Sequence, residues 1–162
     1  MKIYIAGPDV FRTDARAWAD EVYAQCAAHG CEALIPLDGG ETTAAGIYAK
    51  NIEMIRAADV VIANLNPFRG AEPDSGTCFE VGFALALGKR VIAYVESEEP
   101  LKNRVMRMRQ AGKLDDAMQI EDFNLPLNLM LAVSVKLKRS FVEALSSAIA
   151  QGVVVPAKAG TQ

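Results

Sequence analysis

The sequence predicts a single α/β domain built on a doubly wound parallel sheet of five strands, with helices on both faces. Short apolar runs alternate with longer segments in which apolar residues recur at helical spacing, and this alternation is typical of parallel strands joined by right-handed crossovers. One run, DVVIANL at 59–65, is nearly all apolar, as expected for a strand buried on both faces. At 162 residues and 51% hydrophobic, the chain is long enough for one core and too short for two.

The first half of the chain supplies three predicted strands and two predicted helices. The strands are short apolar runs bounded by turn residues, and they lie at residues 2–6, 32–36 and 59–65. The helices are longer and repeat their apolar residues every three or four positions; they lie at residues 13–28 and 43–57. Glycine-containing pairs separate several of these elements: Gly7-Pro8, His29-Gly30 and Gly39-Gly40.

The second half begins regularly and becomes harder to interpret. Its clearest elements are a helix, a strand and a basic helix, at residues 76–87, 90–95 and 101–110. A fifth strand is expected at 117–123, and residues 127–150 fit one long amphipathic helix or a pair of helices. Residues 153–162 are mostly small, so we expect a loosely ordered tail after a domain at 1–152.

Charge and the N-terminal sequence limit the class of partner. A net charge of -3 gives no broad positive field, so we expect small-molecule substrates and no nucleic-acid polymer. The opening MKIYIAG lacks the regions of a signal peptide, and no apolar run approaches the roughly 18 residues of a membrane span. These features predict a cytoplasmic protein that does not contact a membrane.

Cysteine and histidine usage limits the chemistry. Cys26, Cys31 and Cys78 are odd in number and form no CxxC pair, so neither a disulfide framework nor a zinc site is indicated. His29 is the only histidine, and the glycine motifs of dinucleotide and triphosphate sites are absent from the sequence. We therefore expect no metal and no cofactor, with chemistry performed by carboxylates, hydroxyls or backbone groups.

Two carboxylates follow the third predicted strand. Glu80 stands among apolar residues early in its helix, where the helix dipole would help it stay ionised and act as a nucleophile. Asp74, on the preceding loop, supplies a second carboxylate that would protonate a leaving group. A structural alternative stays open, because Thr77 and Glu80 also fit a capping box, with Asp74 in an ordinary turn.

The predicted topology brings the polar loops together. In an open doubly wound sheet, ligands bind beyond the carboxyl ends of the strands, where the strand order reverses. For the order 2-1-3-4-5, the first and third strands flank that crevice. The loop that starts at Gly7 and the loop at 64–76 should therefore face one pocket, which favours the catalytic interpretation.

Three segments resemble the nucleoside 2-deoxyribosyltransferase family: IYIAGPDVF at 3–11, ADVVIANLNPFRGAEPDSGTCFEVGFALALGKRV at 58–91 and LNLM at 127–130. The resemblance implies a flavodoxin-like fold and transfer of 2-deoxyribose from one nucleobase to another through a covalent sugar intermediate, with hydrolysis of 2-deoxynucleosides as a side reaction. It also implies a homo-oligomer in which a neighbouring subunit completes each site, with deoxynucleosides and nucleobases as ligands.

The resemblance assigns roles to five residues. Glu80 matches the nucleophile, Asp74 the carboxylate near base and sugar, and Tyr4 the phenol that positions the nucleophile. Asn128 and Met130 match a pair donated across the subunit interface. Structural alternatives are a buried aromatic residue for Tyr4, a helix N-terminal residue for Asn128 and a core methionine for Met130.

Other candidates for substrate binding surround these groups. Asn51 lies where some family members carry an acidic residue that contacts the base, and an amide both donates and accepts; alternatively it faces solvent. The remaining candidates would shape the base pocket or close the site, with Phe11 stacking on the base: Gly7, Pro8, Asp9, Phe11, Phe68 and Gly76. Arg69 could help to close the site or be solvated.

Two other functions remain open. A related hydrolase would cleave 2-deoxynucleoside 5-monophosphates with the same glutamate, and its phosphate site would draw on Lys102, Arg104, Arg107 and Arg109; a solvated helix face explains the same charges. A non-catalytic nucleotide-binding module would keep the fold and lack turnover. The intact Glu80, Asp74 and Tyr4 favour an enzyme.

Overall fold

The sheet has five parallel strands in the order β2-β1-β3-β4-β5, which confirms the predicted fold class. The computed structural model describes residues 1–37, 40–114 and 117–150. The strands are β1 (Lys2–Ala6), β2 (Glu32–Leu34), β3 (Val60–Asn64), β4 (Arg90–Tyr94) and β5 (Lys136–Lys138). Because β2 pairs with one edge of β1 and β3 with the other, the strand order reverses there, and the crevice predicted for ligands lies at the carboxyl ends of β1 and β3.

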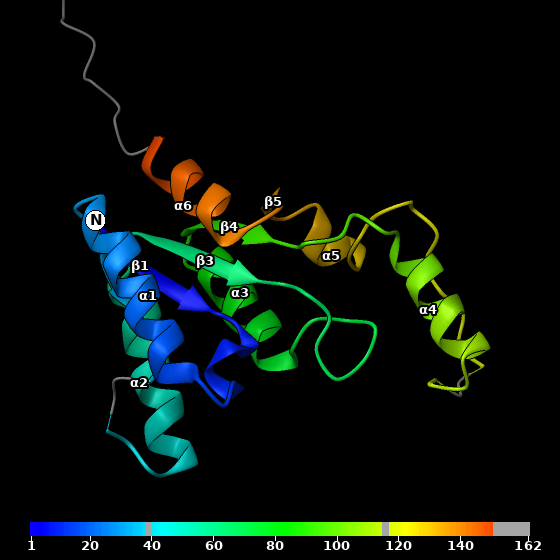
Figure 1. The fold of residues 1–162 in the computed structure, drawn as a ribbon, viewed down its shortest axis with the longest axis horizontal. Coiled ribbons are helices and arrows are strands. Elements are labelled where there is room, and N and C mark those ends of the chain that lie inside the picture. Colours follow the sequence, from blue (N-terminus) through cyan, green and yellow to red (C-terminus); the bar gives the residue numbers. More distant parts are fainter. Residues whose placement is uncertain (38–39, 115–116, 151–162) are drawn as a thin grey trace, which may run out of the picture.

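Helices cover both faces of the sheet (Figure 1). The helices of the described residues are η1 (Pro8–Phe11), α1 (Ala15–Ala28), α2 (Ala44–Ala57), α3 (Ser75–Ala86), α4 (Leu101–Gln110), α5 (Leu129–Ala132) and α6 (Phe141–Ala150). Alternate residues of a strand point to opposite faces, so Ile3 and Ile5 pack with α1 and α6, whereas Tyr4 and Ala6 pack with α2 and α3. This alternation places the phenol of Tyr4 on the same side as α3.

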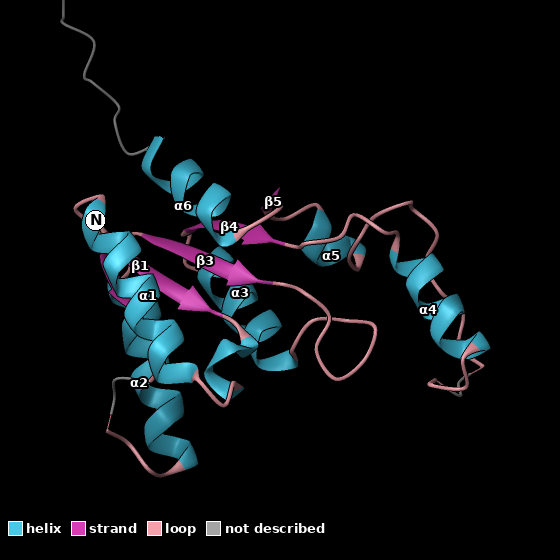
Figure 2. Cartoon of the chain, in the orientation of Figure 1, coloured by secondary structure: helices cyan, strands magenta, loops and turns pink. Residues whose placement is uncertain are grey.

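Helix α4 lies away from the sheet, beyond the carboxyl ends of the strands (Figure 1). Residues 111–114 and 117–128, between α4 and α5, form neither helix nor strand (Figure 2). The buried face of α4 is small: Leu101 and Val105 pack against Ala71 of the loop between β3 and α3. The loop between β3 and α3, which precedes Glu80, therefore contacts α4 as well as the sheet.

The structure corrects the prediction for the last third of the chain. Residues 117–123 form neither a helix nor a strand, and the fifth strand is β5, at the sheet edge beside β4. At 127–150, where one long helix or a pair of helices was predicted, the chain forms two helices, α5 and α6, with the unpredicted strand β5 between them. The strand β5 was missed because it has only three residues, with sequence KLK, and therefore no apolar run. Its lysines also fit the polar face of an amphipathic helix. The predicted tail at 153–162 lies outside the described residues.

Among the helices of the described residues, none has the length and apolarity needed to cross a membrane.

Candidate active site

A cavity of about 340 Å³ lies at the carboxyl ends of β1 and β3. Its walls come from the loop after β1, from α2 and from the start of α3, which are distant in sequence. Six of the residues singled out from the sequence line it: Gly7, Phe11, Asn51, Asp74, Gly76 and Glu80. The structure thus brings both carboxylates to one cavity, where the strand order reverses.

Two donors from different elements hold the Glu80 carboxylate. The Tyr4 hydroxyl donates to Glu80 Oε1 over 2.6 Å, and Asn51 Nδ2 approaches the same oxygen to 3.5 Å. Tyr4 is fully buried in the middle of β1, so the sheet itself fixes the position of the phenol. Both contacts end on Oε1, which orients the carboxylate in the cavity wall.

Burial dominates the ionisation of this pair. The pKa of Glu80 is raised to about 7: desolvation raises it most, the hydrogen bond from Tyr4 lowers it, the charge of Asp74 raises it, and the hydrogen bond from Asn51 lowers it. Desolvation also raises the pKa of the Tyr4 phenol above its usual range, with the Glu80 charge as a second cause. The phenol therefore remains a neutral donor to a carboxylate that titrates near neutral pH.

Asp74 is the N-cap of α3. Its Oδ2 accepts hydrogen bonds from the Thr77 backbone N–H at 2.9 Å and from the Thr77 hydroxyl at 3.0 Å. The alternative capping box was wrong in placing the cap at Thr77, because the helix begins at Ser75. Glu80 consequently lies in the second turn, so the expected help from the helix dipole was also wrong, since that effect falls off within the first turn.

A buried amide that the sequence analysis missed connects the loops around the cavity. Asn64, at the end of β3, is only 8% exposed; its Nδ2 donates to Asp9 Oδ2 over 2.7 Å. Asn64 Oδ1 accepts from the Asn66 backbone at 3.0 Å, and Asn66 Oδ1 accepts from the Glu96 backbone at 2.8 Å. A Cβ at Gly7 would lie 2.8 Å from the Asn64 Cβ. The sequence signal that could have identified Asn64 was a polar residue at the end of an apolar strand.

An aromatic pair joins the loops that follow β1 and β3. The rings of Phe11 and Phe68 stack with centroids 5.6 Å apart, and the Arg69 guanidinium lies 4.6 Å from the Phe68 centroid. Phe11 extends from η1, which also contains Pro8 and Asp9, and its side chain is 59% exposed. An exposed ring at the cavity offers a surface on which a planar ligand can stack.

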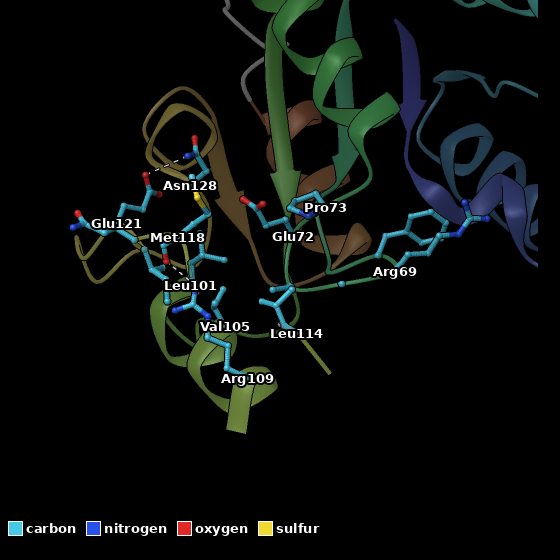
Figure 3. Close-up of a pocket in the computed structure, with 15 residues that line it drawn as sticks. Arg69, Glu72, Pro73, Leu101, Val105, Arg109, Leu114, Met118, Glu121 and Asn128 are labelled. Atoms are coloured by element: carbon cyan, nitrogen blue, oxygen red, sulfur yellow. Dashed lines mark hydrogen bonds between the residues drawn. The ribbon is translucent and has the colours of Figure 1, made fainter. Parts of the chain in front are cut away.

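Asn128 and Met130 lie in another part of the molecule. Asn128 lines a second cavity of about 660 Å³, which lies between the β3–α3 loop, α4 and the segment that follows α4. There the Asn128 Nδ2 donates to Glu121 Oε2 over 3.2 Å (Figure 3). Glu121 Oε1 also accepts from the Leu129 backbone at 2.7 Å. Met130 is 71% exposed, so it is not the core methionine considered as the structural alternative.

Protein groups already engage each of the four basic side chains of α4. Lys102 pairs with Asp122 and Arg107 with Glu99, whereas Arg104 and Arg109 donate to backbone carbonyls. These contacts favour a structural use of the charges over the phosphate site considered from the sequence.

Comparison with known proteins establishes the family. The family model described as nucleoside 2-deoxyribosyltransferase matches residues 3–130. The chain belongs to the nucleoside 2-deoxyribosyltransferase family. Because the members of this family are enzymes, the protein is an enzyme. The span matched by the deoxyribosyltransferase family model includes Tyr4, Asp74, Glu80, Asn128 and Met130.

Two solved structures and one curated sequence are similar to this chain. The 2-desoxiribosyltransferase from Leishmania mexicana is 40% identical, with a TM-score of 0.79 over 92% of this chain and 97% of that one. The CMP N-glycosidase from Clostridium botulinum is 15% identical, with a TM-score of 0.52 over 93% of this chain and 99% of that one, and shows the fold alone. An uncharacterized Schizosaccharomyces pombe protein is 29% identical over 118 residues, which span 67% of this chain and 56% of that relative.

Proposed function

We propose that the protein transfers 2-deoxyribose between nucleobases through an ester of the sugar with Glu80. The observation that carries this proposal is the Tyr4–Glu80 hydrogen bond of 2.6 Å at the wall of a cavity that also contains Asp74. A buried carboxylate held by a phenol and an amide is oriented for attack, and the cavity would exclude much of the water that competes with an acceptor base.

In the first half-reaction, Glu80 Oε2 attacks the anomeric carbon of a 2-deoxynucleoside. We assign attack to Oε2 because Tyr4 and Asn51 both hold Oε1. The C–O ester bond forms as the glycosidic C–N bond breaks through an oxocarbenium-like transition state, and the base leaves with the bonding electrons and gains a proton. In the second half-reaction, a nitrogen of the acceptor base attacks the same carbon, the ester breaks, and the Glu80 carboxylate is regenerated.

Asp74 is assigned to the nucleobase. Its Oδ2 is held by the two Thr77 donors, which leaves Oδ1 to exchange a proton with the departing base and then with the incoming one. Phe11 would stack on the base, and Asn51 would contact its edge. Water in place of the acceptor base gives the side hydrolysis.

We further propose a homo-oligomer in which Asn128 and Met130 complete the site of a neighbouring subunit. The support is positional: Glu80 lines one cavity, Asn128 lines the other, and Met130 is exposed. Two hydrogen bonds hold this segment in a fixed conformation: Asn128 donates to Glu121, and Glu121 accepts from the Leu129 backbone N–H. A residue donated to another subunit requires such a fixed conformation.

The test is an exchange assay with deoxyinosine and adenine, with deoxyinosine alone and Glu80→Ala in parallel. Formation of deoxyadenosine that depends on Glu80 supports transfer. Free hypoxanthine without deoxyadenosine indicates a hydrolase and directs the assay to 5-monophosphates. If no base or monophosphate gives a Glu80-dependent product, the proposed transfer is refuted. For the binding module considered from the sequence, Glu80→Ala should leave ligand affinity nearly unchanged.

A further inference from the structure

A buried arginine outside the cavity joins three separate segments of the chain. The Arg104 residue, on α4, is 6% exposed. Its Nε donates to the Ala71 carbonyl over 2.7 Å and its Nη2 to the Pro126 carbonyl over 2.7 Å, while Nη1 lies 3.5 Å from the Glu99 carbonyl. A buried charge is costly without partners, and here the partners are backbone carbonyl oxygens of the β3–α3 loop and of the segments before and after α4.

Apolar packing supports the same junction. Ala71 is buried in a cluster with Leu101 and Val105 of α4, and the Leu101 backbone N–H donates to the Leu125 carbonyl over 2.8 Å. The β3–α3 loop and the segment before α5 are therefore both fixed to α4, which lies away from the sheet (Figure 1).

We infer that Arg104 is a positioning residue that sets the loop carrying Asp74 and the segment carrying Asn128 relative to each other. Ala71 precedes Asp74 by three residues, and Pro126 precedes Asn128 by two, so each carbonyl held by Arg104 is close in sequence to a residue assigned to the reaction. The inference rests on the proposed function for what these residues do. A planar guanidinium reaches several carbonyls in fixed directions, which a lysine ammonium does not, and its charge strengthens each bond.

The first test is hydrogen exchange, which does not depend on turnover. Wild type, Arg104→Lys and Arg104→Met are compared with Arg107→Met, which removes the guanidinium of an exposed neighbour that pairs with Glu99. We expect faster exchange at 68–74 and 125–131 in the Arg104 variants, with β1 and β3 and the Arg107 variant unchanged. Unchanged exchange in those two segments, or an equal rise throughout the chain, overturns the inference. If Arg104→Met does not fold, the lysine variant decides.

The second test is kinetic and uses the exchange assay. Because a displacement of about 1 Å costs up to roughly 100-fold in rate, we expect Arg104→Lys to lower kcat/KM by about 10- to 100-fold. In an Asp74→Asn background the same change should cost less than it does in wild type, since residues that act through one another are not additive and only the loss that arises through Asn128 remains. Equal losses in both backgrounds contradict the inference. A wild type without transfer refutes the proposed function instead, and leaves the hydrogen-exchange result intact.

Discussion

Glu80 is subject to opposing influences whose balance sets its charge. Burial raises its pKa, while the donors Tyr4 and Asn51 lower it. The proposed attack requires the ionised form, so the strength of these hydrogen bonds should be visible in the pH dependence of the reaction.

Tyr4→Phe removes the stronger of the two donors. Because the phenol lowers the pKa of Glu80, its loss should raise that pKa above about 7 and move the acid limb of kcat/KM to higher pH. The measurement is a pH profile of the exchange reaction. Tyr23→Phe is the matched control, because Tyr23 packs in the core on the other face of the sheet, and its profile should equal that of wild type. An unshifted limb in Tyr4→Phe would contradict the assignment.

Glu80→Gln should stabilise the protein in a pH-dependent way. The pKa of Glu80 rises from 4.5 to about 7 on folding, so the folded state binds more protons in that interval, and its stability falls as pH rises from about 4.5 to 7. At 1.36 kcal/mol per pH unit, the variant should exceed wild type by at most about 3 kcal/mol at pH 8, and by little near pH 4.

Urea unfolding across this pH range measures that difference. Glu53→Gln is the control, since Glu53 is an exposed carboxylate on α2, and its difference from wild type should stay small at every pH. A difference between Glu80→Gln and wild type that is constant with pH would show that Glu80 is not perturbed by burial.

Individual residues were partly predictable from the sequence. Gly7, Asp74 and Glu80 line one cavity, as the topological rule for parallel sheets predicted from the order of elements in the sequence. Asn51, which lines the same cavity, was a candidate only through the family resemblance. The buried Asn64 network was not predictable, because hydrogen bonds between loops depend on backbone positions that no local pattern encodes.

At the scale of elements, the carboxylate of Asp74 at the start of α3 has a structural role and a proposed chemical role. Asp74 caps the helix and also lines the cavity, so its two roles must be separated experimentally.

Asp74→Asn and Asp74→Ala make this separation. Asparagine is an equally good N-cap, so Asp74→Asn should keep the stability of wild type, whereas Asp74→Ala should lose about 1 kcal/mol of unfolding free energy. If Asp74 exchanges a proton with the base, both variants should lose about 100-fold in kcat.

Chemical denaturation and the exchange assay provide the two readouts. Thr43→Ala serves as the control for cap loss, because Thr43 Oγ1 accepts from the Gly46 N–H over 3.1 Å at the start of α2; it should lose similar stability at unchanged kcat. Full activity of the Asp74→Asn variant would show that Asp74 acts only as the N-cap of α3.

Buried strands were predicted from the sequence more successfully than the edge strand. The central strands β1, β3 and β4 are nearly fully buried and were found from their apolar runs. The edge strand β5 was missed, since its KLK sequence pairs with β4 through backbone hydrogen bonds and has little apolar content. Residues 127–150 contain the short helices α5 and α6 on either side of β5.

At the scale of the whole molecule, the proposal assigns the two cavities to sites that are shared between neighbouring subunits. Co-expression of Glu80→Ala and Asn128→Ala chains tests this division, because a mixed dimer would contain one site with both native residues. Random pairing should then restore about a quarter of wild-type exchange activity, while each variant alone stays nearly inactive. Met106→Ala, at an exposed position on α4, co-expressed with Glu80→Ala, is the control for mixing. Absence of restored activity in mixed oligomers would place both residues in one subunit.

The proposal depends most on the covalent sugar ester at Glu80. Intact-protein mass spectrometry after incubation with a 2-deoxy-2-fluoroarabinosyl nucleoside tests it most directly, because the fluorine destabilises an oxocarbenium-like transition state and slows loss of the sugar. We expect a mass increase of one fluorinated sugar, located by peptide mapping at Glu80, absent from Glu80→Gln and reversed by adding adenine. Exchange activity in wild type without any adduct, or an adduct that persists in Glu80→Gln, would contradict the account.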